Sequence, residues 1–227
     1  TKDYFTYPLK FRSTVLVHDA ILSVEPVGKG KLWVGTVSLL PSDNVEGFRS
    51  DVLTILRELN SPVYRWPGGN FVSGYNWRDG IGDRDKRPPR KNPAWQGVEA
   101  NDVGIHEFMR LCELINTEPY IAVNAGLGNS DEAMAEVQYT NGDENTAMGK
   151  LRSANGHNKP CKVKFWSIGN DMYGDWHLGH MSTGQFVAKN NEFADRMRSA
   201  DNSIKLISVG DLGDWDKMVL SNCSDKM

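Results

Sequence analysis

The chain has 227 residues and a formal net charge of −3, and 39% of its residues are hydrophobic. This composition is typical of a globular protein with one sizeable core. Because no excess of positive charge is available, we expect no binding to nucleic acid or to a membrane surface. No apolar run reaches the roughly 20 residues that cross a bilayer, and the first ten residues lack a secretion signal. The compartment is therefore left unknown.

The chain contains three cysteines, Cys112, Cys161 and Cys223. They are too few and too scattered for a disulfide framework or a thiolate metal cluster, so free thiols are predicted. Cys112 falls on the apolar face of a predicted helix, where a small buried side chain is the usual role. The sequence gives no reason to expect a metal or any other cofactor.

The composition of the chain changes near residue 41, which predicts two parts, 1–40 and 41–227. Residues 4–40 contain short β-rich runs, including "YFTYPLKF", "TVLV" and "KLWVGTVSLL", broken by Pro26 and by Gly28 and Gly30. These runs predict an antiparallel β-rich segment. From residue 41 onwards, helical and strand patterns alternate, which predicts a fold of the α/β class.

Four helix-to-strand units are expected after residue 41. "SDNVEGFRSDVLTILREL" predicts a helix, with Asp43 and Glu46 in capping-box spacing, and "SPVYRW" predicts the first strand. A long loop over residues 69–100 leads to a helix from about Asp102, followed by the strand "EPYIAVNAG". "CKVKFWSIGN" is the third strand, Ser182 and Gln185 open the next helix, and "IKLISVG" is the fourth strand. Strands that alternate with helices predict a parallel sheet.

Polar side chains gather where these strands end. Arg65 and Asn70, then Asn124, and finally Asn170 with Asp171 lie at the carboxyl ends of three predicted strands. Any one of them alone is more simply a turn former or a helix cap. Because ligands bind at the carboxyl edge of a parallel sheet, their joint occurrence predicts a site there.

Asp171 has aromatic neighbours in the sequence, namely Trp166, Tyr173 and Trp176. Apolar walls around a carboxyl group favour its neutral form, which a general acid requires. Flat aromatic rings also suit the apolar faces of sugars, and Asn amides can donate hydrogen bonds to hydroxyls and accept them. A carbohydrate-directed acid is therefore the interpretation of this stretch.

Four segments carry a resemblance to a known family: "YRWPGGNFVSGYNWRDGIGDRDKRP", "NPAWQGVEANDVGIHEFMRLCE", "EPYIAVNAGLG" and "KFWSIGNDMYGDWHLGHM". They are similar to the catalytic domain of glycoside hydrolase family 51, the α-L-arabinofuranosidases, from about Leu32 to Gly210. The resemblance implies a (β/α)8 TIM barrel with an accompanying β-sandwich. It also implies release of terminal arabinofuranose, with retention of configuration, from arabinan or arabinoxylan of plant cell walls.

The same resemblance implies a role for each matched residue. Asp171 stands at the acid/base position, where the family has Glu, and Asn170 would bind the hydroxyl next to the anomeric carbon. Asn70 and Trp95 would line the terminal sugar site, and Arg65 would orient the nucleophile. Trp176 would border the neighbouring sugar.

Two departures from the family pattern bear on activity. Asp171 is one methylene shorter than Glu, which withdraws the carboxyl by roughly 1.5 Å, and a misplacement near 1 Å costs about a hundredfold in rate. The family's nucleophilic Glu lies on a later strand, and the chain is expected to hold barrel strands two to five only. The exposed edges of a partial barrel predict self-association into a homo-oligomer, or a fragment of a longer protein.

Other readings of the chain remain open. A non-catalytic carbohydrate binder would keep Asn70, Trp95 and Asn170 without the chemistry. "NAGLGNSD" has two of the three glycines of a phosphate-binding turn. His177 and His180 are spaced like metal ligands, although a surface or sugar-site histidine is the simpler interpretation. The basic run at residues 84–91 is read as a solvated loop.

Overall fold

The structure is a computed structural model, and it describes residues 5–227. The chain divides into two compact units, residues 1–40 and 41–227. Residues 5–40 contain neither helix nor strand, and their side chains are exposed. The predicted β-strands are therefore absent from this stretch, and residues 1–4 lie outside the described part. The physical reason is that a strand needs a neighbouring strand for its ladder of hydrogen bonds, and the sheet contains no strand from residues 5–40.

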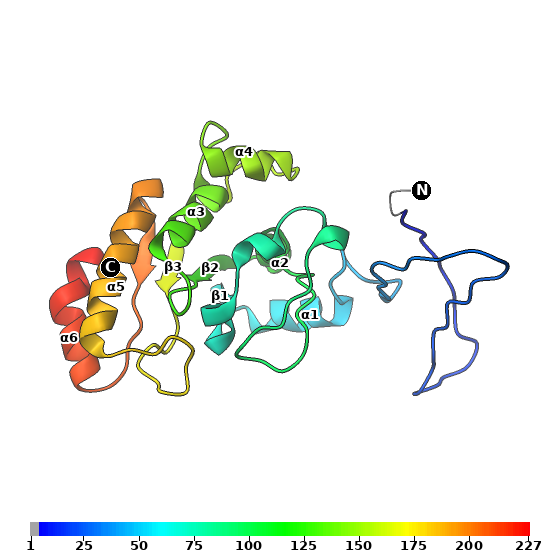
Figure 1. Cartoon of the computed structure of the whole chain (residues 1–227), viewed down its shortest axis with the longest axis horizontal. Helices are drawn as coiled ribbons and strands as arrows, with labels where there is room; N and C mark the ends of the chain where they lie inside the picture. The colour runs from blue at the N-terminus through cyan, green and yellow to red at the C-terminus, as the bar shows by residue number, and fades with distance from the viewer. Residues whose placement is uncertain (1–4) are drawn as a thin grey trace. The chain divides into compact units, whose positions relative to one another are not determined.

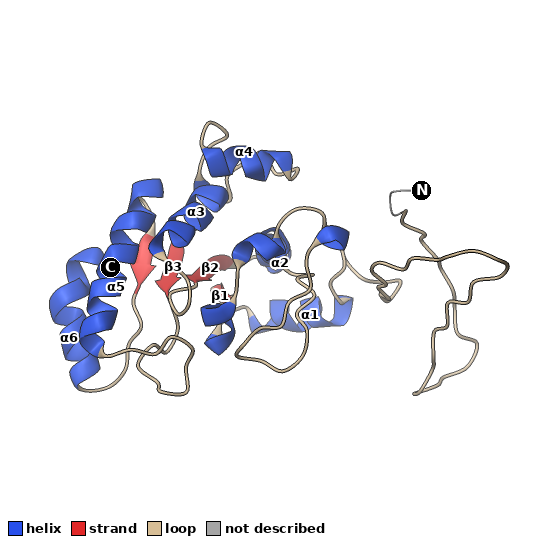
Figure 2. Cartoon of the chain, viewed as in Figure 1, coloured by secondary structure: helices blue, strands red, loops and turns tan. Residues whose placement is uncertain are grey.

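The unit from residue 41 onwards contains helices and strands in alternation (Figures 1 and 2). In chain order they are α1 (Ser50–Leu59), β1 (Val63–Trp66), α2 (Ile105–Ile115), β2 (Glu118–Val123), α3 (Ser130–Asn141), α4 (Ala147–Ala154), β3 (Phe165–Ile168), α5 (Thr183–Ala200), β4 (Lys205–Ile207) and α6 (Asp214–Cys223). Four short 3-10 helices accompany them, η1 (Gly69–Gly74), η2 (Trp77–Gly80), η3 (Arg84–Lys86) and η4 (Ser224–Lys226). The four predicted strands are all confirmed.

The strands form one parallel sheet in the order β1-β2-β3-β4. Arg65 pairs with Tyr120, Tyr120 with Phe165, and Phe165 with Lys205, so these four positions share one face of the sheet. Consecutive parallel strands joined through helices are the repeating unit of a (β/α)8 barrel. The sheet therefore corresponds to part of such a barrel.

The main core lies between the sheet and the helices α2, α3 and α5. Its members come from both layers and are buried: Phe108, Cys112, Ile121, Val123, Ala125, Ala133, Val137, Val163, Trp166, Ile168, Phe193, Ala194, Met197, Ile204 and Leu206. The capping box predicted for α5 is present, because Ser182 accepts from the Gln185 amide and Gln185 in turn accepts from Ser182. Figure 1 shows α5 and α6 side by side at the C-terminal end of this unit.

The start of α1 differs from the sequence-based expectation. The helix begins at Ser50 with Arg49 as its N-cap, so Asp43 and Glu46 form no capping box. Glu46 and Gly47 have φ values of 55° and 93°, which a right-handed helix does not admit. Instead, an isolated bridge between Val45 and Phe48 closes a tight turn.

β1 and β4 are the two edges of the sheet, and α1 flanks the β1 side with an uncovered apolar face. Val52, Ile55 and Leu59 on this face are 41%, 57% and 65% exposed, whereas Leu53 is buried. Self-association through these edges stays a prediction.

Candidate active site

The predicted site residues lie in the loops that follow β1, β2 and β3, except Arg65, which lies within β1. Because the strands are parallel, η1 after β1 and the loop after β3 begin at the same edge of the sheet. The loop after β3 runs from Gly169 to Met181 and is closed by a hydrogen bond from the Met181 amide to the Met172 carbonyl. This loop and η1 form the rim described below.

Asn70 joins η1 to the loop after β3. Its Oδ1 accepts from the amide of Leu178 at 2.8 Å, and its Nδ2 donates to the carbonyl of Trp176 at 3.3 Å. One amide thus satisfies two backbone groups that lie more than 100 positions away in the sequence. Asn70 and the segment around Trp176, both predicted to lie in the site, are neighbours in space.

Asn170 forms a second connection between the same two segments. Its Nδ2 lies 3.2 Å from Nε2 of His177, and Nδ1 of His177 lies 3.2 Å from Oγ of Ser73 in η1. Nδ1 also lies 3.1 Å from the carbonyl oxygen of Leu178. Asn170, His177 and Ser73 are all buried. The rim is therefore held by a continuous polar chain across the ends of β1 and β3.

Asp171 follows Asn170 directly and is half-buried in the left-handed region, at φ 40°. Asp is one of the few side chains that tolerate this conformation. The Asp171 charge, followed by burial and by Asp211, raises the pKa of the Tyr173 hydroxyl. The Asp171 carboxylate and the Tyr173 phenol are therefore close neighbours on the rim.

An aromatic group borders Asp171. The ring of Tyr173 meets Trp176 edge-on at 6.0 Å and Trp215 of α6 edge-on at 5.7 Å. Trp176 is 68% exposed, so one of its faces is available to a ligand. Trp166, predicted as another wall, lies instead in the core, where its indole N–H donates to the Val163 carbonyl. Strand alternation explains this correction, because Trp166 points to the helix-covered face.

Arg65 and Trp95 are placed at the same end of β1. The Arg65 guanidinium packs over Gly68, where an added Cβ would come within 3.0 Å of Nη2. Trp95 is 61% exposed and belongs to a loop that is tied to η1, since Nδ2 of Asn92 donates to the Phe71 carbonyl at 2.9 Å. Both residues are consistent with a ligand-facing position, and their roles stay predictions.

Asn124, at the end of β2, has a structural role. Its Nδ2 donates to the Tyr75 carbonyl, and its Oδ1 accepts from the amides of Leu127 and Gly128. The backbone donors that a phosphate would need in this turn are therefore already used. The turn-former interpretation of Asn124 explains the two contacts of Oδ1, and the contact of Nδ2 ties this turn to the end of η1.

The histidine pair at 177 and 180 does not form a metal centre. His177 is buried with three polar neighbours, whereas His180 is exposed. Within residues 5–227, no three His, Cys, Asp or Glu side chains are grouped as metal ligands. The three cysteines are free, as predicted. No helix in the same range combines the length and apolarity needed to cross a membrane.

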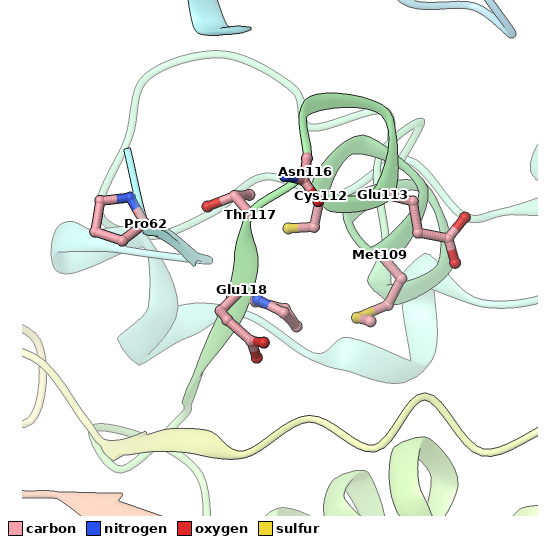
Figure 3. A pocket seen from close by; sticks show the side chains of 8 residues that line it. Pro62, Met109, Cys112, Glu113, Asn116, Thr117 and Glu118 are labelled. Carbon is pink, nitrogen blue, oxygen red and sulfur yellow. The ribbon is translucent and has the colours of Figure 1, made fainter. Parts of the chain in front are cut away.

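A hollow of about 230 Å³ lies at the opposite, amino-terminal end of β2 (Figure 3). Met109, Cys112 and Glu113 of α2 and Glu118 of β2 line it. Burial raises the pKa of the Cys112 thiol to about 12, so this sulfur stays protonated and unreactive. A smaller hollow of about 110 Å³ lies beside η1, between Phe71, Asn92 and Glu99.

Sequence reasoning missed Ser73, a rim residue in η1, and Trp215, an α6 residue that contacts the rim. Ser73 lies inside the quoted segment "YRWPGGNFVSGYNW" but was not singled out, whereas Trp215 lies in a segment without a motif. The contacts of both residues join distant parts of the chain. His177 was noted only as one of a histidine pair. No local pattern reports a contact of this kind.

The fold and the rim together define a portion of a (β/α)8-barrel enzyme domain whose polar groups collect at the carboxyl ends of its strands. The family model of the α-L-arabinofuranosidase 1 domain matches residues 55–225. The chain therefore belongs to the family-51 α-L-arabinofuranosidases, as the sequence resemblance predicted.

Individual relatives agree with this assignment. The chain is 44% identical, over 185 residues, to a probable α-L-arabinofuranosidase C of Aspergillus fumigatus, covering 81% of this chain and 37% of the relative. It is 39% identical to an intracellular exo-α-(1→5)-L-arabinofuranosidase of Bifidobacterium longum, covering 82% and 34%. A solved α-L-arabinofuranosidase of Thermotoga maritima, in complex with arabinose, is 46% identical with a TM-score of 0.76, covering 79% and 37%. The chain thus spans little more than a third of the length of these relatives.

Proposed function

We propose that this chain carries the acid/base side of a retaining α-L-arabinofuranosidase site, which acts on terminal arabinofuranosyl residues of arabinan or arabinoxylan. Asp171 is the general acid/base, and Asn170 and Asn70 lie beside the terminal sugar. The observation that supports this most strongly is the rim itself. Hydrogen bonds from Asn70 and Asn170 converge on one loop, and this loop also carries Asp171.

The chemistry assigns a role to each group. Protonated Asp171 would donate a proton to the leaving oxygen, and its carboxylate would then take one from water during hydrolysis of the glycosyl intermediate. Trp176 offers an exposed ring for the neighbouring sugar, and Trp95 and Arg65 contribute to the terminal sugar site. The second carboxylate of a retaining pair is not identified among the described residues, and we assign no residue to it.

The test is hydrolysis of para-nitrophenyl α-L-arabinofuranoside by the 227-residue chain. We expect Asp171→Ala to lower the rate at least about a hundredfold, the usual contribution of a general acid. Asp171→Glu restores the missing methylene and should raise the rate by up to about a hundredfold. Asp175→Ala, a matched change of an exposed carboxylate in the same loop, should leave the rate unchanged. Activity that survives Asp171→Ala would refute the assigned role.

A second candidate function is sugar binding without turnover. The second carboxylate that a retaining glycosidase requires is not identified among the described residues, and this favours binding without turnover, because no glycosyl intermediate forms without a nucleophile. A folded chain that binds L-arabinose but releases none from the chromogenic substrate, with either Asp or Glu at position 171, would establish this alternative.

A further inference from the structure

We infer that His177 is a positioning residue that fixes the orientation of the Asn170 amide toward the sugar. The inference rests on the proposed function for its ligand, but its structural part can be tested separately. The inference is based on the chain of polar contacts that runs from Ser73 through His177 to Asn170.

The contacts of His177 select one tautomer of its ring. The Leu178 carbonyl, 3.1 Å from Nδ1, can only accept a hydrogen bond, so Nδ1 carries the proton. In the neutral ring, Nε2 is then an acceptor, and the group 3.2 Å away must be a donor. Asn170 presents Nδ2 to that nitrogen, which is the donor end of its amide. The acceptor beside Nδ1 and the donor beside Nε2 therefore both fit the same tautomer, in which only Nδ1 is protonated.

This arrangement determines which end of Asn170 is left for a ligand. Because Nδ2 is engaged by the imidazole, Oδ1 is the end that a sugar hydroxyl can donate to. Without His177, the amide would be free to rotate by half a turn and to present either end. Holding a polar group in one orientation before the ligand arrives removes an entropic cost of binding.

Ser73 anchors the ring from the other side. Its hydroxyl lies in η1, three residues beyond Asn70, and approaches Nδ1 at 3.2 Å. Ser73, His177 and Asn170 are 0%, 3% and 4% exposed, so water competes little for these hydrogen bonds. The His177 ring therefore also links η1 to Asn170, so the placement of η1 affects the placement of the Asn170 amide.

The structural part is tested by NMR on the 15N-labelled chain at neutral pH. We expect His177 to show a protonated Nδ1 and an unprotonated Nε2, and the Asn170 side-chain amide to give a distinct, slowly exchanging pair of signals. His177→Leu should abolish this pair, whereas His177→Gln, which can still accept from Nδ2, should retain it. His180→Leu, the matched change of an exposed histidine in the same loop, should have no effect. A proton on Nε2 of His177, or an unaltered Asn170 signal in His177→Leu, would overturn the inference.

The ligand part is tested by titrating the same samples with L-arabinose. We expect His177→Leu to weaken binding about tenfold, the effect of losing one ordered hydrogen bond, and His177→Gln to restore most of it. Equal affinity in the wild-type chain and in His177→Leu would overturn positioning. If the wild-type chain binds no L-arabinose while the expected tautomer is observed, the proposed function fails and the His177–Asn170 geometry stands.

Discussion

His177 and His106 are both buried, yet they connect different parts of the protein. His177 joins two loops at the ends of strands and contacts Asn170 and Ser73. His106 lies on α2, and its Nε2 is hydrogen-bonded to the hydroxyl of Tyr139 on α3 at 2.8 Å. Its ring stacks on His157, with ring centroids 3.4 Å apart. Burial and hydrogen bonding are thus common to both, and only the elements that they connect differ.

The comparison teaches that position along the strands separates a residue of the rim, where we propose the sugar site, from a residue that only joins helices. Groups at the carboxyl ends of strands face the place where a ligand binds, whereas groups between helices hold packed elements together. Substitutions of residues buried between helices should therefore lower the free energy of unfolding and leave L-arabinose binding unchanged. Substitutions at the rim should weaken L-arabinose binding and change the free energy of unfolding little.

The largest effect is expected at Arg152, which belongs to the region of His106 and His157. This fully buried guanidinium donates to four carbonyls, those of Tyr139, Gly142, His157 and Asn158. Arg152→Met leaves these acceptors without partners, so we expect a loss of about 3–5 kcal/mol in the free energy of unfolding. Urea denaturation measures it, and the exposed Arg49→Met should change stability by less than about 0.5 kcal/mol. A loss below about 1 kcal/mol in Arg152→Met would contradict the structural role.

The next effect concerns Glu136, a buried carboxyl on α3. Burial, reinforced by Glu132, raises its pKa to about 8 from an ordinary value near 4.5. The folded state thus holds a proton that the unfolded state releases, and stability falls as pH rises from about 4.5 to 8. We expect a loss on the order of 3 kcal/mol between pH 5 and 8, and Glu136→Gln should remove it.

Denaturation of both chains at the two pH values measures this effect. Glu58→Gln, on the exposed surface of α1, serves as the matched control and should change stability by less than about 0.5 kcal/mol. The same pH dependence in wild type and Glu136→Gln would show that Glu136 is not the group responsible.

His106 should produce a pH dependence of opposite sign. Burial, and then the neighbouring His157, lowers its pKa to about 3 from about 6.5. The unfolded state therefore binds a proton that the folded state does not, and stability falls as pH drops below about 6.5. We expect a loss of about 2 kcal/mol between pH 6.5 and 5, reduced in His106→Gln. Urea denaturation across this range measures it, and a slope that His106→Gln leaves unchanged would assign the effect elsewhere.

The smallest effect reports on the rim. Because the charge of Asp171 raises the pKa of the Tyr173 hydroxyl, Asp171→Asn should lower that pKa toward the ordinary value. Spectrophotometric titration of the phenol, with Tyr173→Phe to identify its signal, measures the shift. An unchanged titration in Asp171→Asn would mean that the two side chains are not neighbours, and Asp171 would then lie outside the rim.

The sequence by itself determined the α/β unit and most of its boundaries. Apolar runs such as "YIAV" and the capping box at Ser182 and Gln185 are local patterns, and local patterns specify local structure. The motif containing Asn170 and Asp171 likewise identified the family. The expectation failed in two places. The strands predicted within residues 5–40 are not formed, because the sheet offers them no neighbouring strand. The helix predicted from Asp43 starts only at Ser50, because Glu46 and Gly47 have positive φ.

Only the tertiary structure decided which polar groups share the rim. Asn70 and Asn170 are brought together through the loop after β3, whereas Asn124 closes its own turn and ties that turn to the Tyr75 carbonyl at the end of η1. Trp166 lies in the core and not beside Asp171, whereas Ser73 contacts His177 and Trp215 contacts Tyr173. The physical reason is that hydrogen bonds and ring contacts form between side chains that are close in space. The sequence gives only how far apart residues are along the chain.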